Sequence, residues 1–358
     1  MLVLAACTSS ASPSPSVTTP SSAPEETTGG TEPSEAPTGV TLPPPEITDL
    51  RIGNSGEPTV NNLNAVIAKH LDLGSKYGLN IEWIQFAGAG QAAQALLAEQ
   101  VHFGDNSGGP AIASLASDSP MLISYVSRDN LTDNLYGAPG IETADDLRGG
   151  SVAISSFGSQ SHAGALVALA QLGLTPDDVT ITQVGNDSAR MAALQGGSVA
   201  ASMNDATQAA DLEALGFTTL VKLSDTVADP DQGVTRIGVT TLREFAEENP
   251  NTVLAVVAMY LEASVIWRND PELAAEALAA AVEAPIEEVR EEVTFILGEP
   301  WRPIDGRCNP KVMEFTLLTL LPENPSLAEV NPADACTNDF IDQLEELGFL
   351  SEIGVEGY

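Results

Sequence analysis

Residues 80–104, NIEWIQFAGAGQAAQALLAEQVHFG, place a strand, a helix and a second strand in close succession. Asn80–Phe86 alternates polar and apolar side chains, Gln91–Glu99 is rich in alanine and leucine, and Val101–Gly104 is again β-like. Strands that alternate with helical stretches are typical of a sheet whose strands are joined by crossover helices. This stretch therefore predicts the α/β class.

The same alternation continues on both sides of this unit. Further strands are expected at Leu50–Gly53, Met121–Val126, Ser151–Ser155, Val179–Val184, Val199–Met203, Thr218–Leu223 and Arg236–Val239. Helices are expected between them at Asn61–Leu71, Pro110–Ala116, Ser161–Leu172, Ser188–Gln195 and Ala206–Leu215. The pattern restarts after Pro139-Gly140 and becomes mostly helical from Thr241 to Gly348. Two α/β lobes with a helical C-terminal portion follow.

The composition limits the function. The chain has 358 residues, of which 43% are hydrophobic, and a net charge of −36 from 50 acidic and 14 basic residues. Such a charge repels a phosphate backbone, so we expect no nucleic-acid partner. A membrane-spanning helix needs about 18 uninterrupted apolar residues. The nearest candidate, Val253–Trp267, is interrupted by Glu262 and is better interpreted as a buried core helix.

The N-terminus resembles that of a bacterial lipoprotein. Leu4-Ala5-Ala6-Cys7 resembles a lipobox, and residues 8–46 contain 16 Ser/Thr and 9 Pro with few apolar side chains. Such a segment cannot offset its ordering entropy and is expected to be a disordered linker. We interpret residues 1–7 as the remnant of a signal peptide that begins upstream, and Cys7 as a lipid-anchored residue that gives the sole membrane attachment. An unmodified Cys7 beside a disordered tail is the alternative.

The remaining cysteines lie near the C-terminus. An extracytoplasmic, oxidising location predicts a disulfide between Cys308 and Cys336, and two free buried thiols are the alternative. His70, His102 and His162 are scattered and do not accompany the cysteines, so we expect no metal and no cofactor.

Several motifs, in order, resemble the extracytoplasmic binding proteins of nitrate, sulfonate and taurine ABC importers, a family that includes binders of thiamine-pyrimidine precursors. The motifs are residues 76–82 (KYGLNIE), 88–90 (GAG), 101–104 (VHFG), 144–149 (ADDLRG) and 189–197 (ARMAALQGG). The resemblance runs from about residue 50 to 270 and implies a type II periplasmic-binding-protein architecture. In that architecture the chain crosses twice between lobes, here near Tyr136–Pro139 and Gly233–Gly238. Lobe 1 would combine residues 47–138 with 236–358, and lobe 2 would be residues 139–235.

Ligands of open α/β sheets bind beyond the carboxyl ends of strands, near helix N-termini. The residues expected there are Asn54, Ser55, Asn106, Ser107, Gly108 and Arg128 from lobe 1, and Phe157, Ser159, Gln160, Ser161, Asn186, Asn204 and Asp205 from lobe 2. Gly158-Ser159-Gln160-Ser161 is the strongest candidate, because free N–H groups and hydroxyls at a helix start bind polar or anionic groups. Alternatively, Ser159 or Ser161 merely caps the helix. Arg128 is a candidate ion-pair partner or a surface arginine, and Phe157 a stacking platform.

These features indicate a binding protein rather than an enzyme. The sequence offers no Ser-His-Asp, paired-carboxylate or metal-ligand constellation. We expect a monomer that passes a small sulfonate, nitrate or pyrimidine-like ligand to an ABC permease and its ATPase. Two alternatives stay open: a lipid-anchored sensory binding module, and a cytosolic enzyme of thiamine-pyrimidine synthesis with the same fold and a histidine donor. Residues 88–93 (GAGQAA) imitate a dinucleotide-binding fingerprint, but the signal is weak.

Overall fold

The computed structural model describes residues 39–106, 108–117, 120–131, 133–223, 233–235, 237–298, 305–322 and 324–355. The chain divides after Gly39, and the unit that begins at Val40 carries all the features described below. Cys7, the predicted signal-peptide remnant and most of the predicted linker lie outside the described residues.

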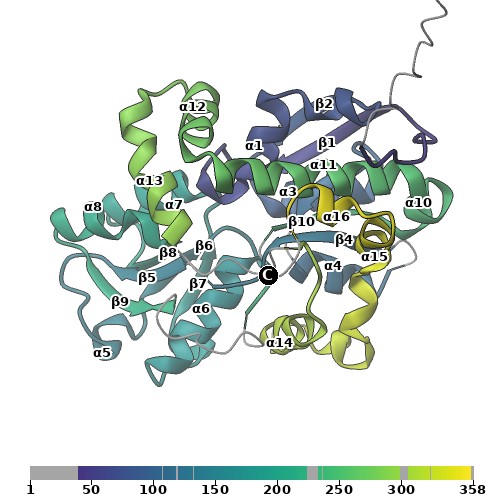
Figure 1. The fold of residues 1–358 in the computed structure, drawn as a ribbon. Helices are drawn as coiled ribbons and strands as arrows, with labels where there is room; N and C mark the ends of the chain where they lie inside the picture. Colours follow the sequence, from purple (N-terminus) through teal and green to yellow (C-terminus); the bar gives the residue numbers. More distant parts are fainter. Residues whose placement is uncertain are drawn as a thin grey trace, which may run out of the picture. The chain divides into compact units, whose positions relative to one another are not determined.

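The described strands form two five-stranded sheets, one in each lobe (Figure 1). The lobe 1 sheet has the order β2-β1-β3-β10-β4, with β1 (Asp49–Ser55), β2 (Asn80–Phe86), β3 (Phe103–Asn106), β4 (Met121–Arg128) and β10 (Ile237–Leu242). The lobe 2 sheet has the order β7-β6-β8-β5-β9, with β5 (Asp133–Gly137), β6 (Ser151–Ile154), β7 (Thr180–Gln183), β8 (Ala201–Asp205) and β9 (Thr218–Lys222). The α/β class and the two-lobed architecture are confirmed.

The two sheets share one topology. In lobe 1, β1 pairs in parallel with β2 and β3, and β10 pairs antiparallel with β3 and β4. In lobe 2, β6 pairs in parallel with β7 and β8, and β5 pairs antiparallel with β8 and β9. The antiparallel strand of each sheet is therefore the one that the chain forms as it arrives from the other lobe.

The first crossing between the lobes lies earlier in the chain than predicted. β5 belongs to the lobe 2 sheet, so the chain crosses before Asp133 and not near Tyr136–Pro139. The return segment at Gly233 lies against the outgoing one, because a Cβ atom at Gly233 would lie 1.8 Å from the carbonyl oxygen of Asp129. The two crossing segments thus run in backbone contact, which glycine alone permits at position 233.

Helices cover both sheets and make up most of the C-terminal portion, as expected from the sequence. Lobe 1 carries α1 (Leu63–His70), α2 (Leu73–Lys76), α3 (Ala89–Leu97) and α4 (Gly108–Ser114); lobe 2 carries α5 (Ala144–Leu147), α6 (Gln160–Gln171), α7 (Asp187–Gln195) and α8 (Ala209–Ala214). The chain then forms α10 (Arg243–Glu248), α11 (Pro250–Asn269), α12 (Pro271–Val282), α13 (Ile286–Gly298), α14 (Pro310–Leu320), α15 (Asp339–Glu346) and α16 (Phe349–Glu352). Short 3-10 turns lie at η1 (Val60–Asn62), η2 (Pro176–Asp178), η3 (Ala206–Gln208), η5 (Pro325–Glu329) and η6 (Pro332–Ala335).

Helix α11 is the core helix of lobe 1. It packs against α1, β4 and α15, and buries residues from Thr252 to Trp267 (Figure 1). By length and composition alone it would pass as a membrane span, but 72% of its most apolar window is buried inside the fold. Lobe 2 has a separate core that includes Leu135, Ile154, Leu169 and Met203.

The segment that precedes β1 is part of the folded unit. Val40, Leu42 and Ile47 pack against the lobe 1 core, and the Glu46 carboxylate accepts hydrogen bonds from Asn251 N (3.0 Å) and Thr252 N (2.8 Å) at the start of α11. Burial raises the pKa of Glu46, but these hydrogen bonds outweigh it and lower the pKa. The predicted linker therefore ends near Gly39 rather than at residue 46, because a few apolar residues and one capping carboxylate suffice to dock it.

The C-terminal portion is closed by a covalent link. Cys308 and Cys336 form a disulfide whose Cα atoms are 6.5 Å apart. Cys336 also forms a β-bridge with Ile123 in β4, so the disulfide ties the segment before α14 to the lobe 1 sheet.

Candidate functional site

A cavity of about 180 Å³ lies where strand-end loops of the two lobes meet. Its lobe 1 wall follows β1 and β2, and its lobe 2 wall follows β6, β7 and β8, so it occupies the carboxyl ends of the strands. The lining residues are Ser55, Gly56, Glu57, Thr59, Asn61, Asn62, Gly88 and Ala89 from lobe 1, and Ser155, Ser159, Gln160, Ser161, Asn186, Asp187, Ser188, Arg190 and Gln208 from lobe 2.

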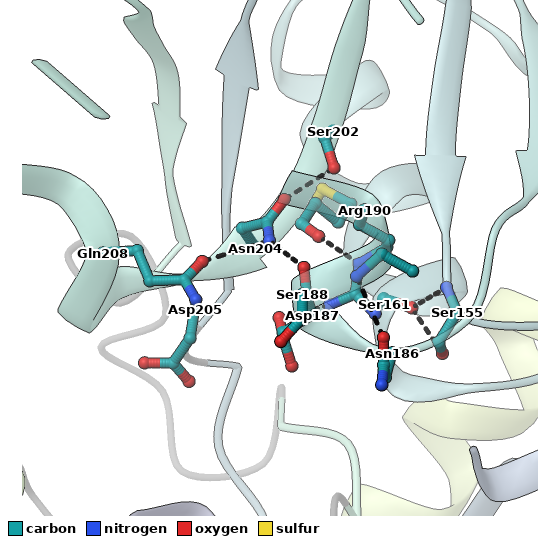
Figure 2. A network of polar contacts seen from close by, with 12 residues as sticks. Ser155, Ser161, Asn186, Asp187, Ser188, Arg190, Ser202, Asn204, Asp205 and Gln208 are labelled. Carbon is teal, nitrogen blue, oxygen red and sulfur yellow. Dashed lines mark hydrogen bonds and ion pairs between the residues drawn. The ribbon is translucent and has the colours of Figure 1, made fainter. Parts of the chain in front are cut away.

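Three serine hydroxyls form a cluster at the start of α6. The Oγ atoms of Ser155, Ser159 and Ser161 lie 2.8 to 3.0 Å from one another. Ser161 Oγ also accepts the Ser155 N–H at 2.8 Å (Figure 2). Ser159 is the N-cap, because its Oγ accepts the His162 N–H at 3.3 Å. The capping and ligand-site interpretations of this loop are therefore compatible, since the capping serine also lines the cavity.

Gln160 points to a missing hydrogen-bond acceptor. Its side chain lines the cavity and is 9% exposed, yet its Nε2 atom is buried and has no hydrogen-bond partner among the described residues. An unsatisfied buried donor costs roughly 1–3 kcal/mol, so such a group calls for a partner. A ligand oxygen in the cavity would supply one.

A second helix N-terminus faces the same cavity from lobe 1. Helix α3 begins at Ala89 after Gly88 and has no side-chain cap, and both residues line the cavity. The first amides of a helix carry partial positive charge and favour anions. One helix start from each lobe, together with Gln160, thus makes this end of the cavity rich in hydrogen-bond donors.

Two carboxylates also line the cavity, Asp187 from lobe 2 and Glu57 from lobe 1. Arg190 is 3% exposed and binds Asp187 Oδ1 at 2.5 Å and two carbonyl oxygens, Met203 O at 2.6 Å and Gly185 O at 2.8 Å (Figure 2). Its charge is therefore used within lobe 2. Glu57 of lobe 1 is solvent-exposed, and its carboxylate reaches across to Ser188 Oγ (3.0 Å) and Asn186 Nδ2 (3.4 Å).

The structure brings together part of the predicted site. Ser55, Ser159, Gln160, Ser161 and Asn186 line the cavity. The Asn106 side chain and Ser107 lie outside the described residues.

Three other predicted residues face elsewhere. Asn54 lines a separate groove beside α1 and α12, because successive side chains of a strand point to opposite faces. Gly108 is absent from the lining, and its N–H donates to Thr235 O at 2.8 Å in the returning segment. Phe157 is also absent from the lining; it is 54% exposed and makes an edge contact with the His162 ring.

Arg128, Asn204 and Asp205 support the site instead of lining it. Arg128 is 1% exposed, so it is not a surface arginine, and it donates to Asn130 and Asn61. Asn61 Nδ2 in turn donates to Asp205 Oδ2 at 3.0 Å, which bridges the lobes. Asn204 binds Ser202, the Asp187 carbonyl and Gln208 (Figure 2). These groups hold the strand ends in place.

Sequence reasoning missed more than half of the lining. The residues that it did not select are Gly56, Glu57, Thr59, Asn61, Asn62, Gly88, Ala89, Ser155, Asp187, Ser188, Arg190 and Gln208. Many of them lie in or beside the strand-end loops that the sequence identifies, so the loops were detectable. Which side chain of a loop faces the cavity depends on the opposite lobe.

Two buried titratable groups lie beside the site. Asp105, at the end of β3, is 2% exposed, and burial raises its carboxyl pKa from 3.8 to about 7. His162, in the first turn of α6, is 1% exposed, and burial lowers its imidazole pKa from 6.5 to about 4. Asp105 therefore keeps its proton below about pH 7, and His162 stays uncharged above about pH 4.

A larger cavity, of about 710 Å³, lies at the opposite ends of the lobe 1 strands, the amino ends of the parallel ones. Its lining includes Arg51 near the start of β1, Pro120 directly before β4 and Leu242 at the end of the antiparallel β10. We place the candidate site in the smaller cavity, because ligands of such sheets bind at the carboxyl ends of the parallel strands and Gln160 lies there. Among the described residues, no group of three His, Cys, Asp or Glu side chains is arranged to hold a metal ion.

Comparison with known proteins relates the chain to a family. A family model described as NMT1/THI5 like matches residues 60–274. No curated protein sequence matches the chain. The periplasmic aliphatic sulphonate binding protein SsuA from Escherichia coli is 24% identical, with 81% of this chain and 91% of that chain covered and a TM-score of 0.61.

Two further solved structures show how widely the fold is used. The periplasmic nitrate-binding protein NrtA from Synechocystis PCC 6803 is 13% identical, with 87% of this chain and 90% of that chain covered and a TM-score of 0.65. The desulfurization enzyme DSZB is 17% identical, with 84% and 99% covered and a TM-score of 0.54. At these identities the likeness shows the fold, which binding proteins and an enzyme share.

Proposed function

The chain belongs to the NMT1/THI5-like family, and from this premise we propose that it is an extracytoplasmic solute-binding protein. In this proposal a small polar or anionic molecule binds between the two lobes and is delivered to an ABC permease and its ATPase. A lipid on Cys7, followed by the polar stretch to Gly39, would tether the folded unit while leaving it free to reach a membrane partner.

One observation carries the proposal: the buried Gln160 Nε2 that lacks an acceptor at the meeting point of two helix N-termini. An oxygen-bearing head group in the cavity would accept from this amide and from the first turns of α3 and α6. Because these donors come from both lobes, the same ligand would favour the conformation in which the lobes meet.

The size of the cavity favours a small ligand. Its volume of about 180 Å³ lies below the roughly 300–1,000 Å³ of pockets for drug-sized molecules. We therefore favour short oxyanions over flavins or phosphorylated pyrimidines.

The test compares the full chain with the variant Gln160→Leu in thermal unfolding. The probes are taurine, propane-1-sulfonate, β-alanine, butyrate and nitrate. A ligand at 100 times its Kd adds about 2.7 kcal/mol to the unfolding free energy. We expect at least one probe to stabilise the wild-type chain and to lose this effect in Gln160→Leu, while the ligand-free variant is as stable as wild type, because leucine leaves no unsatisfied amide.

Gln195→Leu, at the exposed end of α7, makes the same chemical change away from the cavity and serves as the control. Silence of all five probes on the wild-type chain would contradict the proposal for these head groups. Equal stabilisation of wild type and Gln160→Leu would place the binding elsewhere.

A further inference from the structure

Most of the described residues that line the cavity have polar side chains. The lining contains no aromatic residue, and alanine (Ala89) is its one apolar side chain among the described residues. Small-molecule pockets are usually lined mostly by apolar and aromatic groups, with a few polar ones. A ligand that fits this lining offers several hydrogen-bonding groups to the polar side chains. A long alkyl tail or a flat aromatic ring would leave many lining groups without partners.

The lining combines hydrogen-bond donors with carboxylates. The donors come from Ser159, Gln160, Ser161 and the start of α3, and the carboxylates belong to Glu57 and Asp187. Asp187 is paired with Arg190 at 2.5 Å. The hydrogen-bond partners of Glu57 are the neutral groups of Ser188 and Asn186. Arg190 is the one cationic side chain of the described lining, and Glu57 and Asp187 are its two carboxylates. The net charge of the lining is therefore −1.

We propose that Glu57 is a specificity-determining residue that binds an ammonium group of the ligand. The ligand is then a short zwitterion, with an oxyanion at the α3 and α6 starts and an amine at Glu57. This inference rests on the proposed function and narrows its ligand class. A charge-assisted hydrogen bond, such as one between ammonium and carboxylate, is roughly twice as strong as a bond between two neutral groups.

The position of Glu57 also couples this recognition to the approach of the lobes. Glu57 belongs to lobe 1, and both of its partners, Ser188 and Asn186, lie at the start of α7 in lobe 2. An ammonium group at this point would bind the carboxylate beside the lobe 2 hydroxyl and amide. A methyl group there would bury the carboxylate against an apolar surface, which is unfavourable.

The experiment uses two pairs of probes that differ in one group. Taurine and propane-1-sulfonate differ in ammonium against methyl, and so do β-alanine and butyrate. Isothermal titration of the full chain should show an amine preference of about tenfold or more in Kd, the usual size of a hydrogen bond to a charged group. Glu57→Gln should lose most of this preference, and Glu57→Lys should reverse it. Glu276→Gln, the same charge change on the exposed face of α12, should keep it.

The outcomes separate this inference from the proposed function. If neither member of either pair binds the wild-type chain, the proposed function fails for these head groups. If both members of a pair bind wild type with equal affinity, the zwitterion inference fails and the proposed function stands. If Glu57→Gln weakens the amine and methyl probes equally, Glu57 only links the lobes and does not select the ligand.

Discussion

The two lobes share one sheet topology, but the loop after the first parallel strand of each brings different side chains to the cavity. In lobe 2 the loop after β6 supplies three hydroxyls and the Gln160 amide, all ahead of α6 or in its first turn. In lobe 1 the loop after β1 supplies the Glu57 carboxylate. The shared topology fixes where the loops meet, and the residues within each loop decide what the loop binds.

The same contrast holds for the buried titratable groups. Lobe 1 keeps Asp105 neutral because burial raises its pKa, so the carboxyl holds its proton. Lobe 2 keeps His162 neutral because burial lowers its pKa, so the imidazole releases its proton. Each lobe thus has one buried group whose charged form is disfavoured, and the two groups depend on pH in opposite ways.

The largest expected effect is on the lobe 1 acid. The folded pKa of Asp105, about 7, exceeds its ordinary value of 3.8, so the folded state binds the proton more tightly. The free energy of unfolding should therefore fall as pH rises from about 4 to 7, by up to ~4 kcal/mol at 1.36 kcal/mol per pKa unit. The variant Asp105→Asn has no carboxyl group at this position, so its unfolding free energy should not fall in this way as pH rises. Relative to wild type, the variant should gain stability from pH 4 to pH 8 in urea unfolding.

The quantity to compare is the pH dependence, because a buried asparagine amide adds a constant cost of its own. Asp177→Asn, an exposed acid in η2, controls for the change in net charge. Parallel pH profiles for Asp105→Asn and wild type would show that folding does not raise the pKa of Asp105.

The lobe 2 base should give a smaller effect of opposite sign. The folded pKa of His162, about 4, lies below 6.5, so the unfolded state binds more protons between these values. Stability should fall as pH drops from 6.5 to 4, by up to ~3 kcal/mol. His162→Gln, whose side-chain oxygen replaces Nδ1 as acceptor of the Gly158 N–H, should flatten this loss. His70→Gln changes an exposed histidine and is the matched control. If His162→Gln lost stability at low pH as steeply as wild type, the lowered pKa could not be assigned to His162.

Much of this framework was predictable from residue patterns. The strand at Asn80–Phe86 was placed with its observed bounds, because alternation and flanking glycines act locally. β5 was missed, since it begins with Asp133 and Asn134, which are buried between β8 and β9. Polar residues at the start of a strand signal a loop. The burial of Asp133 and Asn134 depends on pairing with β8 and β9, which are distant in the sequence, so the local pattern does not predict it.

The candidate site was predictable by loop and not by residue. Ser159, Gln160 and Ser161 were found because a helix start is a local signal. Ser55 and Asn54 are adjacent in one strand, yet Ser55 alone faces the cavity. Glu57 was not selected, because its importance comes from Asn186 and Ser188, about 130 residues away in the chain. Contacts between lobes cannot be derived from the pattern of either lobe alone.

The backbone contact between α4 of lobe 1 and the loop before α6 of lobe 2 offers the last and smallest expected effect. A Cβ atom at Gly109 in α4 would lie 1.8 Å from the carbonyl oxygen of Gly158, before α6. The backbone atom that it meets cannot rotate away, so Gly109→Ala should force the lobes apart. Alanine itself favours a helix, and lobe 1 should therefore fold normally. Overpacking of this kind costs about 1–3 kcal/mol, or a roughly 5- to 150-fold loss of the closed population.

Gly90→Ala is the matched control, because Gly90 also lies near a helix start at the lobe interface. Its added Cβ atom would lie 3.5 Å from Ser156, an ordinary contact. Spin labels at Glu82→Cys and Asp177→Cys, in a Cys7→Ala background, report the distance between the lobes by pulsed electron paramagnetic resonance. The distance distribution should shift to longer values in Gly109→Ala and stay unchanged in Gly90→Ala. An unchanged distribution in both would mean that the two loops yield locally, and that the contact between Gly109 and Gly158 does not limit how closely the lobes approach.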